Sequence, residues 1–186
     1  MKNSQNKGFD QHYNAQIAVD QTTLLIVSHS LSNHTNDFLD GLPTVDAISS
    51  RIGKPERVAL DNGYFSHTNI EGFRSRKIEP YIATGRQSHH LTLKALQAEP
   101  LTPPDANASP KSQMAYQLQT DVGKACYRLR KCTVEPVIGI IKETMGFRQF
   151  SLRGLTKVAG EWALVCLAFN LKRLHRLKNL ISPTGC

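Results

Sequence analysis

An α/β fold is the prediction for this chain, and three observations support it. Short runs rich in β-branched and aliphatic residues recur along the first half of the sequence, as expected of strands. Segments of helical periodicity that open on Ser, Thr or Asn separate the later runs from one another. The resulting order of strand, strand, helix, strand, helix and strand is typical of α/β proteins with parallel crossovers.

The first two strands are expected to pair as a hairpin. Residues 13–20 (YNAQIAVD) alternate, with Ala15, Ile17 and Val19 on one side. Residues 24–31 (LLIVSHSL) are rich in β-branched and aliphatic residues and predict the second strand. Only three residues separate the two runs, so an antiparallel connection is the natural one.

Two helices and two further strands are predicted next. Thr35 or Asn36 would cap the first helix, and Pro43 would either begin it or kink it. The other three elements, in chain order, are a strand at 57–61, a helix that opens at 66–69 and a strand at 80–84.

Residues 86–120 are predicted to contain an insertion or long loop, because prolines punctuate them, although a helix can resume at Pro110. The final third, residues 127–181, is predicted to be helical with one break at 146–154. Residues 162–169 are apolar nearly all round and are expected to be buried, with Trp162 in the core rather than stacked on a base. The whole chain, 1–186, is expected to be one domain.

The net charge of +8 comes entirely from the C-terminal part. Residues 1–120 hold 11 Lys/Arg and 11 Asp/Glu, whereas residues 121–186 hold 12 Lys/Arg and 4 Asp/Glu. This asymmetry favours a polyanion partner such as DNA, and a solvated basic helix face is the alternative. No apolar stretch is long enough to cross a membrane and no secretion signal opens the chain, so we expect a cytoplasmic protein, associated with the nucleoid when it binds DNA.

Two acids stand at positions that favour chemistry. Asp61 ends a predicted strand, where ligands bind in open α/β sheets; the alternative is that it only organises the Asn-Gly turn. Glu135 opens a helix, and Lys131 and Lys142 would share its face at 3.6 residues per turn. For Glu135 the alternative is a solvated ion pair.

Together the two carboxylates predict a pair of bound Mg²⁺ ions, with Mn²⁺ as a substitute, acting on a phosphodiester. Neighbouring cations would grip the DNA backbone: Arg128, Arg130, Lys131 and Lys142. Arg148 and Arg153 lie around a glycine-flanked break and predict a DNA-facing elbow, with a solvated basic turn as the alternative.

The segments YNAQIAVD, LDNGYFS, YRLRKCTVEPVIGIIKETMGFRQFSLRGL and WALVCLAFNLKRL resemble the DDE transposases of bacterial insertion sequences. The resemblance spans nearly the whole chain and is most specific at its C-terminal block. Four residues match the signature of that block: Tyr127, Arg130, Glu135 and Lys142. The gap from Arg130 to Glu135 is one residue longer than usual, so Lys131 is the alternative for the arginine position.

The resemblance implies an RNase H-like mixed sheet flanked by helices, with Asp61 as the second catalytic aspartate and Glu135 as the catalytic glutamate. The family's first aspartate lies on the first strand, and neither Asp10 nor Asp20 suits that position. We therefore expect a C-terminal portion of a transposase that lacks its first strand, has reduced stability and is catalytically impaired alone. The implied partners are the DNA of transposon ends and target, together with a homodimer or a complementing N-terminal chain. A catalytically inactive DNA-binding remnant and a structure-specific nuclease are the alternative functions.

Overall fold

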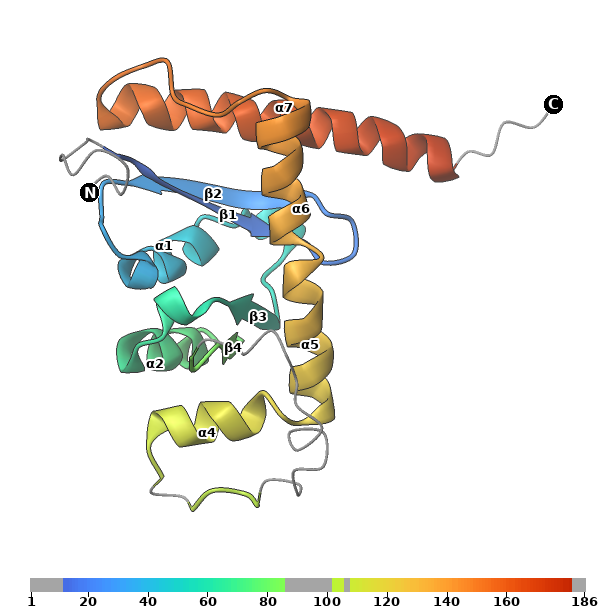
Figure 1. Cartoon of the computed structure of the whole chain (residues 1–186). Coiled ribbons are helices and arrows are strands. Elements are labelled where there is room, and N and C mark those ends of the chain that lie inside the picture. Colours follow the sequence, from blue (N-terminus) through green and yellow to red (C-terminus); the bar gives the residue numbers. More distant parts are fainter. Residues whose placement is uncertain (1–11, 86–101, 106–107, 182–186) are drawn as a thin grey trace. The chain divides into compact units, whose positions relative to one another are not determined.

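The computed structural model describes residues 12–85, 102–105 and 108–181 (Figure 1). The chain forms two compact units. The first combines Met1–Lys54 with Arg130–Cys186, and the second is Pro55–Leu129. Both contain strands and helices, so the predicted α/β class is confirmed.

The first unit contains the predicted hairpin. Strands β1 (Asn14–Val19) and β2 (Ile26–Ser32) pair antiparallel, from Asn14 opposite Ser32 to Val19 opposite Ile26. The register shifts between Ala18 and Val19, which places a bulge beside the turn. The Asp20 carboxylate closes this turn by accepting from the backbone N–H and the hydroxyl of Thr23, both at 2.7 Å. These bonds, first that of the hydroxyl, lower the pKa of Asp20.

One face of the hairpin is apolar and packs on helices. Ala15, Ile17 and Val19 lie against a buried cluster, as their alternation predicted. The cluster is built by α6 (Val134–Gly139), α7 (Leu155–Ile181) and the start of β2. In Figure 1, α7 lies along one face of the hairpin and α1 (Gly41–Asp46) along the other.

Trp162 lies at the centre of this core, as predicted, and is 4% exposed. Its ring nitrogen donates to the backbone carbonyl of Gln16 at 3.2 Å, and its ring packs against Phe147 and Phe150. One turn further on, Cys166 is buried among the same side chains, and burial raises the pKa of its thiol to about 12. This thiol is therefore structural.

The expectation that residues 162–169 are buried throughout is wrong for one face of the helix. Cys166 and Phe169 are 2% and 3% exposed, but Leu164 and Leu167 are 67% and 54% exposed. A straight helix packed on a two-stranded hairpin offers only one stripe for burial.

The other face of the hairpin is polar and carries a hydrogen-bond network centred on Asp40, which is 4% exposed. Its carboxylate accepts from the Ser32 hydroxyl at 2.7 Å and from the Asn14 amide at 3.2 Å, and it contacts the His34 ring at 2.8 Å. The Asn14 amide also donates to Asp37 at 2.7 Å. These bonds fasten the segment after β2 to the start of β1.

We expect Asp40→Ala to lower the free energy of unfolding by about 2–4 kcal/mol, because it removes the buried acceptor to which Ser32 and Asn14, both half-buried, donate. Urea unfolding followed by circular dichroism measures this loss. Truncation of the exposed Glu56 to alanine is the control and should change stability by less than about 0.5 kcal/mol. Equal midpoints for the two variants would contradict a stabilising network.

The helix predicted after β2 is divided into short pieces. They are the 3₁₀ turn η1 (Asp37–Leu39), α1 (Gly41–Asp46) and the 3₁₀ turn η2 (Ser50–Ile52). Asn36 stands at the N-cap of η1 but makes no side-chain cap bond. Pro43 lies in the first turn of α1, where its missing N–H costs no helical bond.

The second unit holds the predicted strands β3 (Arg57–Leu60) and β4 (Glu79–Ile82), which pair in parallel. Between them lie η3 (Asn62–Tyr64) and α2 (His67–Ser75), whose N-cap Ser66 accepts from the N–H of Asn69 at 3.1 Å. Helices α4 (Pro110–Gln117) and α5 (Asp121–Lys131) follow.

A small core joins these elements through Ile70, Ile82 and Met114. Pro110 occupies the first turn of α4, as predicted. Most of the predicted insertion, 86–101 and 106–107, lies outside the described residues.

The prediction of one break in the final third is wrong, because the structure has two. Besides the loop before α7, residues 132–133 separate α5 from α6. The Thr133 hydroxyl donates to the carbonyl of Arg130 at 2.9 Å and ends α5 in a tight turn. Pro136 lacks the N–H that an uninterrupted helix would need there. The break falls within the lengthened gap between Arg130 and Glu135.

Candidate active site

Glu135 lies on the first turn of α6, and its side chain is 61% exposed. The opposite side of this helical segment is fixed in the core by Val137 and Ile141, which are 0% and 1% exposed. The guanidinium of Arg130, only 15% exposed, lies 3.9 Å from the Glu135 carboxylate. The buried side of the helix thus fixes its position, and the opposite side presents the Glu135 carboxylate to solvent beside the Arg130 guanidinium.

Lys142 is exposed on η4 (Ile140–Thr144), a π-helical turn that continues α6. The expectation of a shared face for Glu135 and Lys142 assumed 3.6 residues per turn. A π-turn is wider than an α-turn, so the angular relation between the two residues differs from that expectation. Lys131 is the last residue of α5.

The basic loop at 146–154 is fastened by one acid that the sequence did not single out. The carboxylate of Glu161, on α7, accepts from the backbone N–H groups of Ser151 at 2.8 Å and Leu152 at 3.0 Å. These two bonds, first that of Ser151, lower the pKa of Glu161. At the end of the loop, the N–H of Gly154 donates to the Tyr13 hydroxyl at 2.9 Å.

Both arginines of this loop are exposed. Arg148 pairs with Glu143, and Arg153 directly precedes Gly154. Gly146 and Gly154 have φ angles of 73° and 87°, in the left-handed region that favours glycine. The loop therefore has a defined shape and holds cations at the surface.

We expect the loop to loosen in acid. Folding lowers the pKa of the Glu161 carboxyl. The stabilisation that this carboxylate gives the loop is therefore complete above pH 4.5, near its pKa in the unfolded chain, and is lost as the pH falls through its lower pKa in the folded chain. NMR should show the amide protons of Ser151 and Leu152 titrating together below pH 4.5. In Glu161→Gln the titration should disappear, and its persistence would contradict this assignment.

Asp61 belongs to the second unit and follows β3, as predicted. Its side chain is exposed and accepts from the N–H of Asn62 at 2.7 Å, which caps η3. Asp61 thus organises the turn after β3 through this bond, and its carboxylate is exposed to solvent. Tyr127 and Arg128 lie on α5 in the same unit, half-buried and exposed respectively.

Metal binding by these acids is chemically reasonable, since carboxylate oxygens are the ligands that Mg²⁺ prefers. Within the described ranges, however, no group of three or more His, Cys, Asp or Glu side chains is arranged to hold an ion. The chain thus offers exposed carboxylates at Asp61 and Glu135 without a third ligand in the described part. No helix among the described residues is long and apolar enough to cross a membrane.

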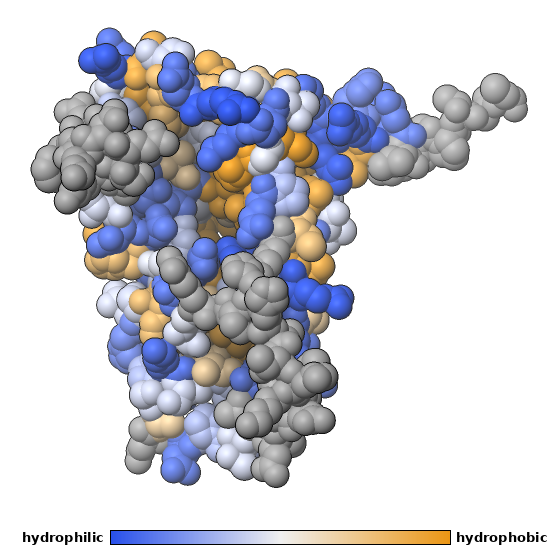
Figure 2. Space-filling view, viewed as in Figure 1, coloured by the Kyte–Doolittle hydropathy of each residue, from blue (hydrophilic) through white to orange (hydrophobic). Residues whose placement is uncertain are grey.

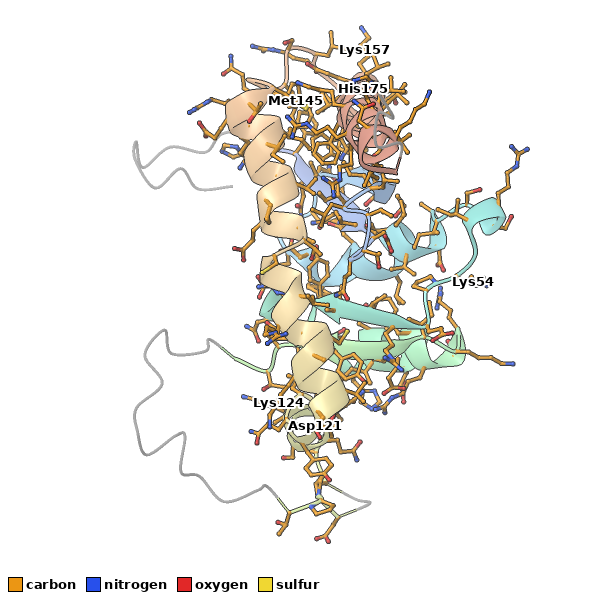
Figure 3. All side chains as sticks on the ribbon, turned by 90° about the vertical axis from the view of Figure 1, so that its right-hand side faces the viewer. Lys54, Asp121, Lys124, Met145, Lys157 and His175 are labelled. Carbon is orange, nitrogen blue, oxygen red and sulfur yellow. The ribbon has the colours of Figure 1, made fainter. Side chains whose placement is uncertain are left out.

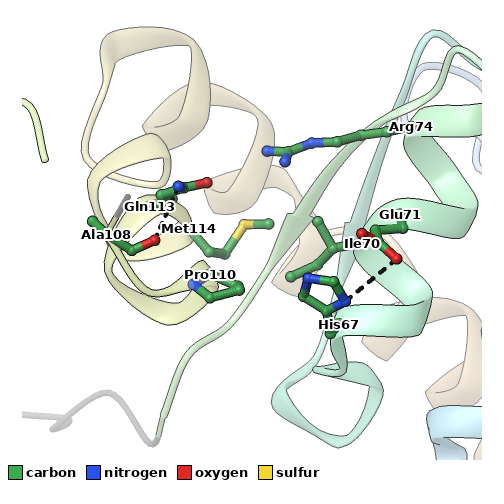
Figure 4. Close-up of a pocket in the computed structure, with 8 residues that line it drawn as sticks. All are labelled: His67, Ile70, Glu71, Arg74, Ala108, Pro110, Gln113 and Met114. Atoms are coloured by element: carbon green, nitrogen blue, oxygen red, sulfur yellow. Dashed lines mark hydrogen bonds and ion pairs between the residues drawn. The ribbon is translucent and has the colours of Figure 1, made fainter. Parts of the chain in front are cut away.

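The second unit also has a pocket that contains none of the predicted site residues (Figure 4). Ile70 and Met114 are among its apolar lining residues, and His67 and Glu71 form an ion pair of 3.3 Å at its edge. The Arg74 side chain also lines it.

Comparison with known families finds one match, and it lies in the C-terminal part. Residues 98–175 match the family model of the transposase DDE domain. Over this segment the chain is similar to the DDE domain of transposases. Neither a curated protein nor a solved structure matches the chain.

The DDE segment includes Glu135 and the basic residues that surround it, whereas Asp61 lies before the segment. The resemblance inferred from the sequence is thus confirmed for the C-terminal block. Sequence reasoning missed Glu161 and Asp40. Asp40 stands at the N-cap of α1 but makes no side-chain cap bond, and the roles of both residues come from bonds to chain segments that folding brings near.

Proposed function

We propose that the protein cleaves DNA and transfers the cut strand during transposition. The family match over residues 98–175 carries this proposal, because it contains Glu135 and 11 of the 23 Lys/Arg residues of the chain. The polyanion partner expected from the charge distribution is then the DNA of transposon ends and target.

We propose Asp61 and Glu135 as the residues that hold Mg²⁺ or Mn²⁺. Bound divalent ions would activate a water or a 3′-hydroxyl and stabilise the leaving oxygen. The exposed Glu135 carboxylate is fixed from behind by its buried helix face, which supports a fixed ligand position. Arg130 beside it would orient the carboxylate through their ion pair.

The DNA itself would be held by side chains around these acids. Exposed cations on α5, η4 and the loop at 146–154 suit contacts with successive phosphates. The proposed DNA-binding residues are Tyr127, Arg128, Arg130, Lys131, Lys142, Arg148 and Arg153. From the resemblance to DDE transposases we also propose that the chain is an RNase H-like catalytic domain. It would act in the cytoplasm, at the nucleoid when it binds DNA.

The second candidate function is DNA binding without reaction. It is favoured by the sequence, in which neither Asp10 nor Asp20 suits the position of the family's first catalytic aspartate. A strand-transfer assay on labelled DNA ends, run with Mg²⁺ or with EDTA, separates the two candidates, and fluorescence anisotropy measures binding in parallel. Mg²⁺-dependent products support the enzyme. Salt-sensitive binding without products supports the DNA-binding protein, and the absence of both would contradict the two proposals.

A further inference from the structure

Helix α7 carries a second apolar face that no described residue covers. Four leucines lie on it, at 50–67% exposure: Leu164, Leu167, Leu171 and Leu174. Their spacing of three, four and three residues is that of the a and d positions of a coiled coil. At 100° per residue this leucine stripe lies opposite Trp162 and Phe169, which are buried on the hairpin.

Polar residues border the leucine stripe. In Figure 2, apolar surface appears along α7, and hydrophilic surface dominates toward its C-terminal end. Monomeric proteins rarely leave an ordered row of large aliphatic side chains in water, so such a row marks an interaction site.

We propose that the leucine stripe is the interface of a homodimer in which the α7 helices of two copies pack antiparallel. The stripe is self-complementary about Phe169: Leu164 of each copy then faces Leu174 of the other, and Leu167 faces Leu171. Ala163 and Ala168 flank it and allow the helices to approach closely.

Charge decides the direction of the pair. The C-terminal half of α7 carries four cations and no acid, whereas the N-terminal half carries one cation, Lys157, and one acid, Glu161. A parallel pair would place the two basic ends together, while an antiparallel pair separates them and brings each basic end toward the acid of the other copy.

The size of the stripe sets the expected strength. Two heptads of one helix bury less than the roughly 1,200 Å² at which standard interfaces begin, a size typical of weak or transient complexes. We therefore expect a dissociation constant on the order of 10 µM. This inference does not depend on the proposed DNA chemistry.

Sedimentation velocity of the full chain tests the dimer. Concentrations from 1 to 200 µM extend roughly tenfold below and above the expected dissociation constant. The wild type should shift from monomer to dimer, and the Leu167→Gln/Leu171→Gln variant should weaken association by about 100-fold. Leu39→Gln, at a leucine that is 52% exposed outside α7, is the matched control and should dimerise like the wild type. Circular dichroism verifies that each variant is folded.

The direction of packing is tested by spin-label distances from Lys157→Cys and His175→Cys, two α7 positions labelled in Figure 3. Cys126, Cys132 and Cys186 are replaced by serine beforehand. An antiparallel pair places the two copies of position 157 about 36 Å apart along the axis and those of position 175 about 18 Å apart, at 1.5 Å per residue. A parallel pair gives short distances at both positions.

Three results would overturn the proposal. They are a wild type that is monomeric at about 200 µM, a leucine variant that dimerises as well as the wild type, and short distances at both labels. If another segment or another protein covers the leucine stripe, the wild type stays monomeric, which is the first of these results.

Discussion

Glu135→Gln is expected to lower Mg²⁺-dependent strand transfer by about 100-fold or more, the largest effect of any single substitution on activity. Glutamine has nearly the same shape and can still contact Arg130, which lies 3.9 Å from the carboxylate. It lacks the negative charge with which a carboxylate binds a hard divalent cation. Shape and packing are thus kept while the proposed metal ligand is removed.

DNA binding separates this explanation from a loss of structure. In EDTA, Glu135→Gln should bind DNA as tightly as the wild type or slightly more tightly, because a negative charge near the phosphates is gone. Glu56→Gln, which neutralises an exposed carboxylate outside the DDE segment, is the control and should keep wild-type activity. Activity of Glu135→Gln equal to that of the control would exclude Glu135 as a metal ligand.

Trp162→Ala is expected to lower the free energy of unfolding by about 3–5 kcal/mol, the largest effect on stability. The ring is 4% exposed, contacts Phe147 and Phe150, and donates a hydrogen bond to the Gln16 carbonyl. Its removal opens a cavity between α7 and the hairpin and leaves that carbonyl without this donor. Because the stability of single domains is typically marginal, a fraction of the Trp162→Ala molecules is expected to be unfolded even without denaturant.

Trp162→Phe keeps the test informative if the alanine variant does not fold. It retains an aromatic ring but loses the indole N–H, so a smaller loss of about 1–2 kcal/mol is expected. Urea unfolding followed by circular dichroism measures both variants against Leu39→Ala, which truncates an exposed leucine and should cost less than about 0.5 kcal/mol. A Trp162→Ala midpoint close to that of Leu39→Ala would contradict the central position of this side chain.

Local pattern was sufficient to predict several elements and the positions of Asp61 and Glu135 relative to their strand and helix. Alternation along residues 13–20 predicted both the first strand and its buried side, because successive side chains of a strand point to opposite faces. The place of Asp61 directly after β3 and the buried side of α6 behind Glu135 followed in the same way. These features depend on residues that are close in sequence.

Folding decided the features that depend on distant residues. Pattern alone could not reveal that Glu161 binds the backbone ten residues earlier, or that Asp40 joins both strands of the hairpin. The apolar run in α7 predicted burial on every side, but only the side toward the hairpin is buried. A sequence records which side chains avoid water, whereas the number of surfaces available to cover them is a property of the assembled chain.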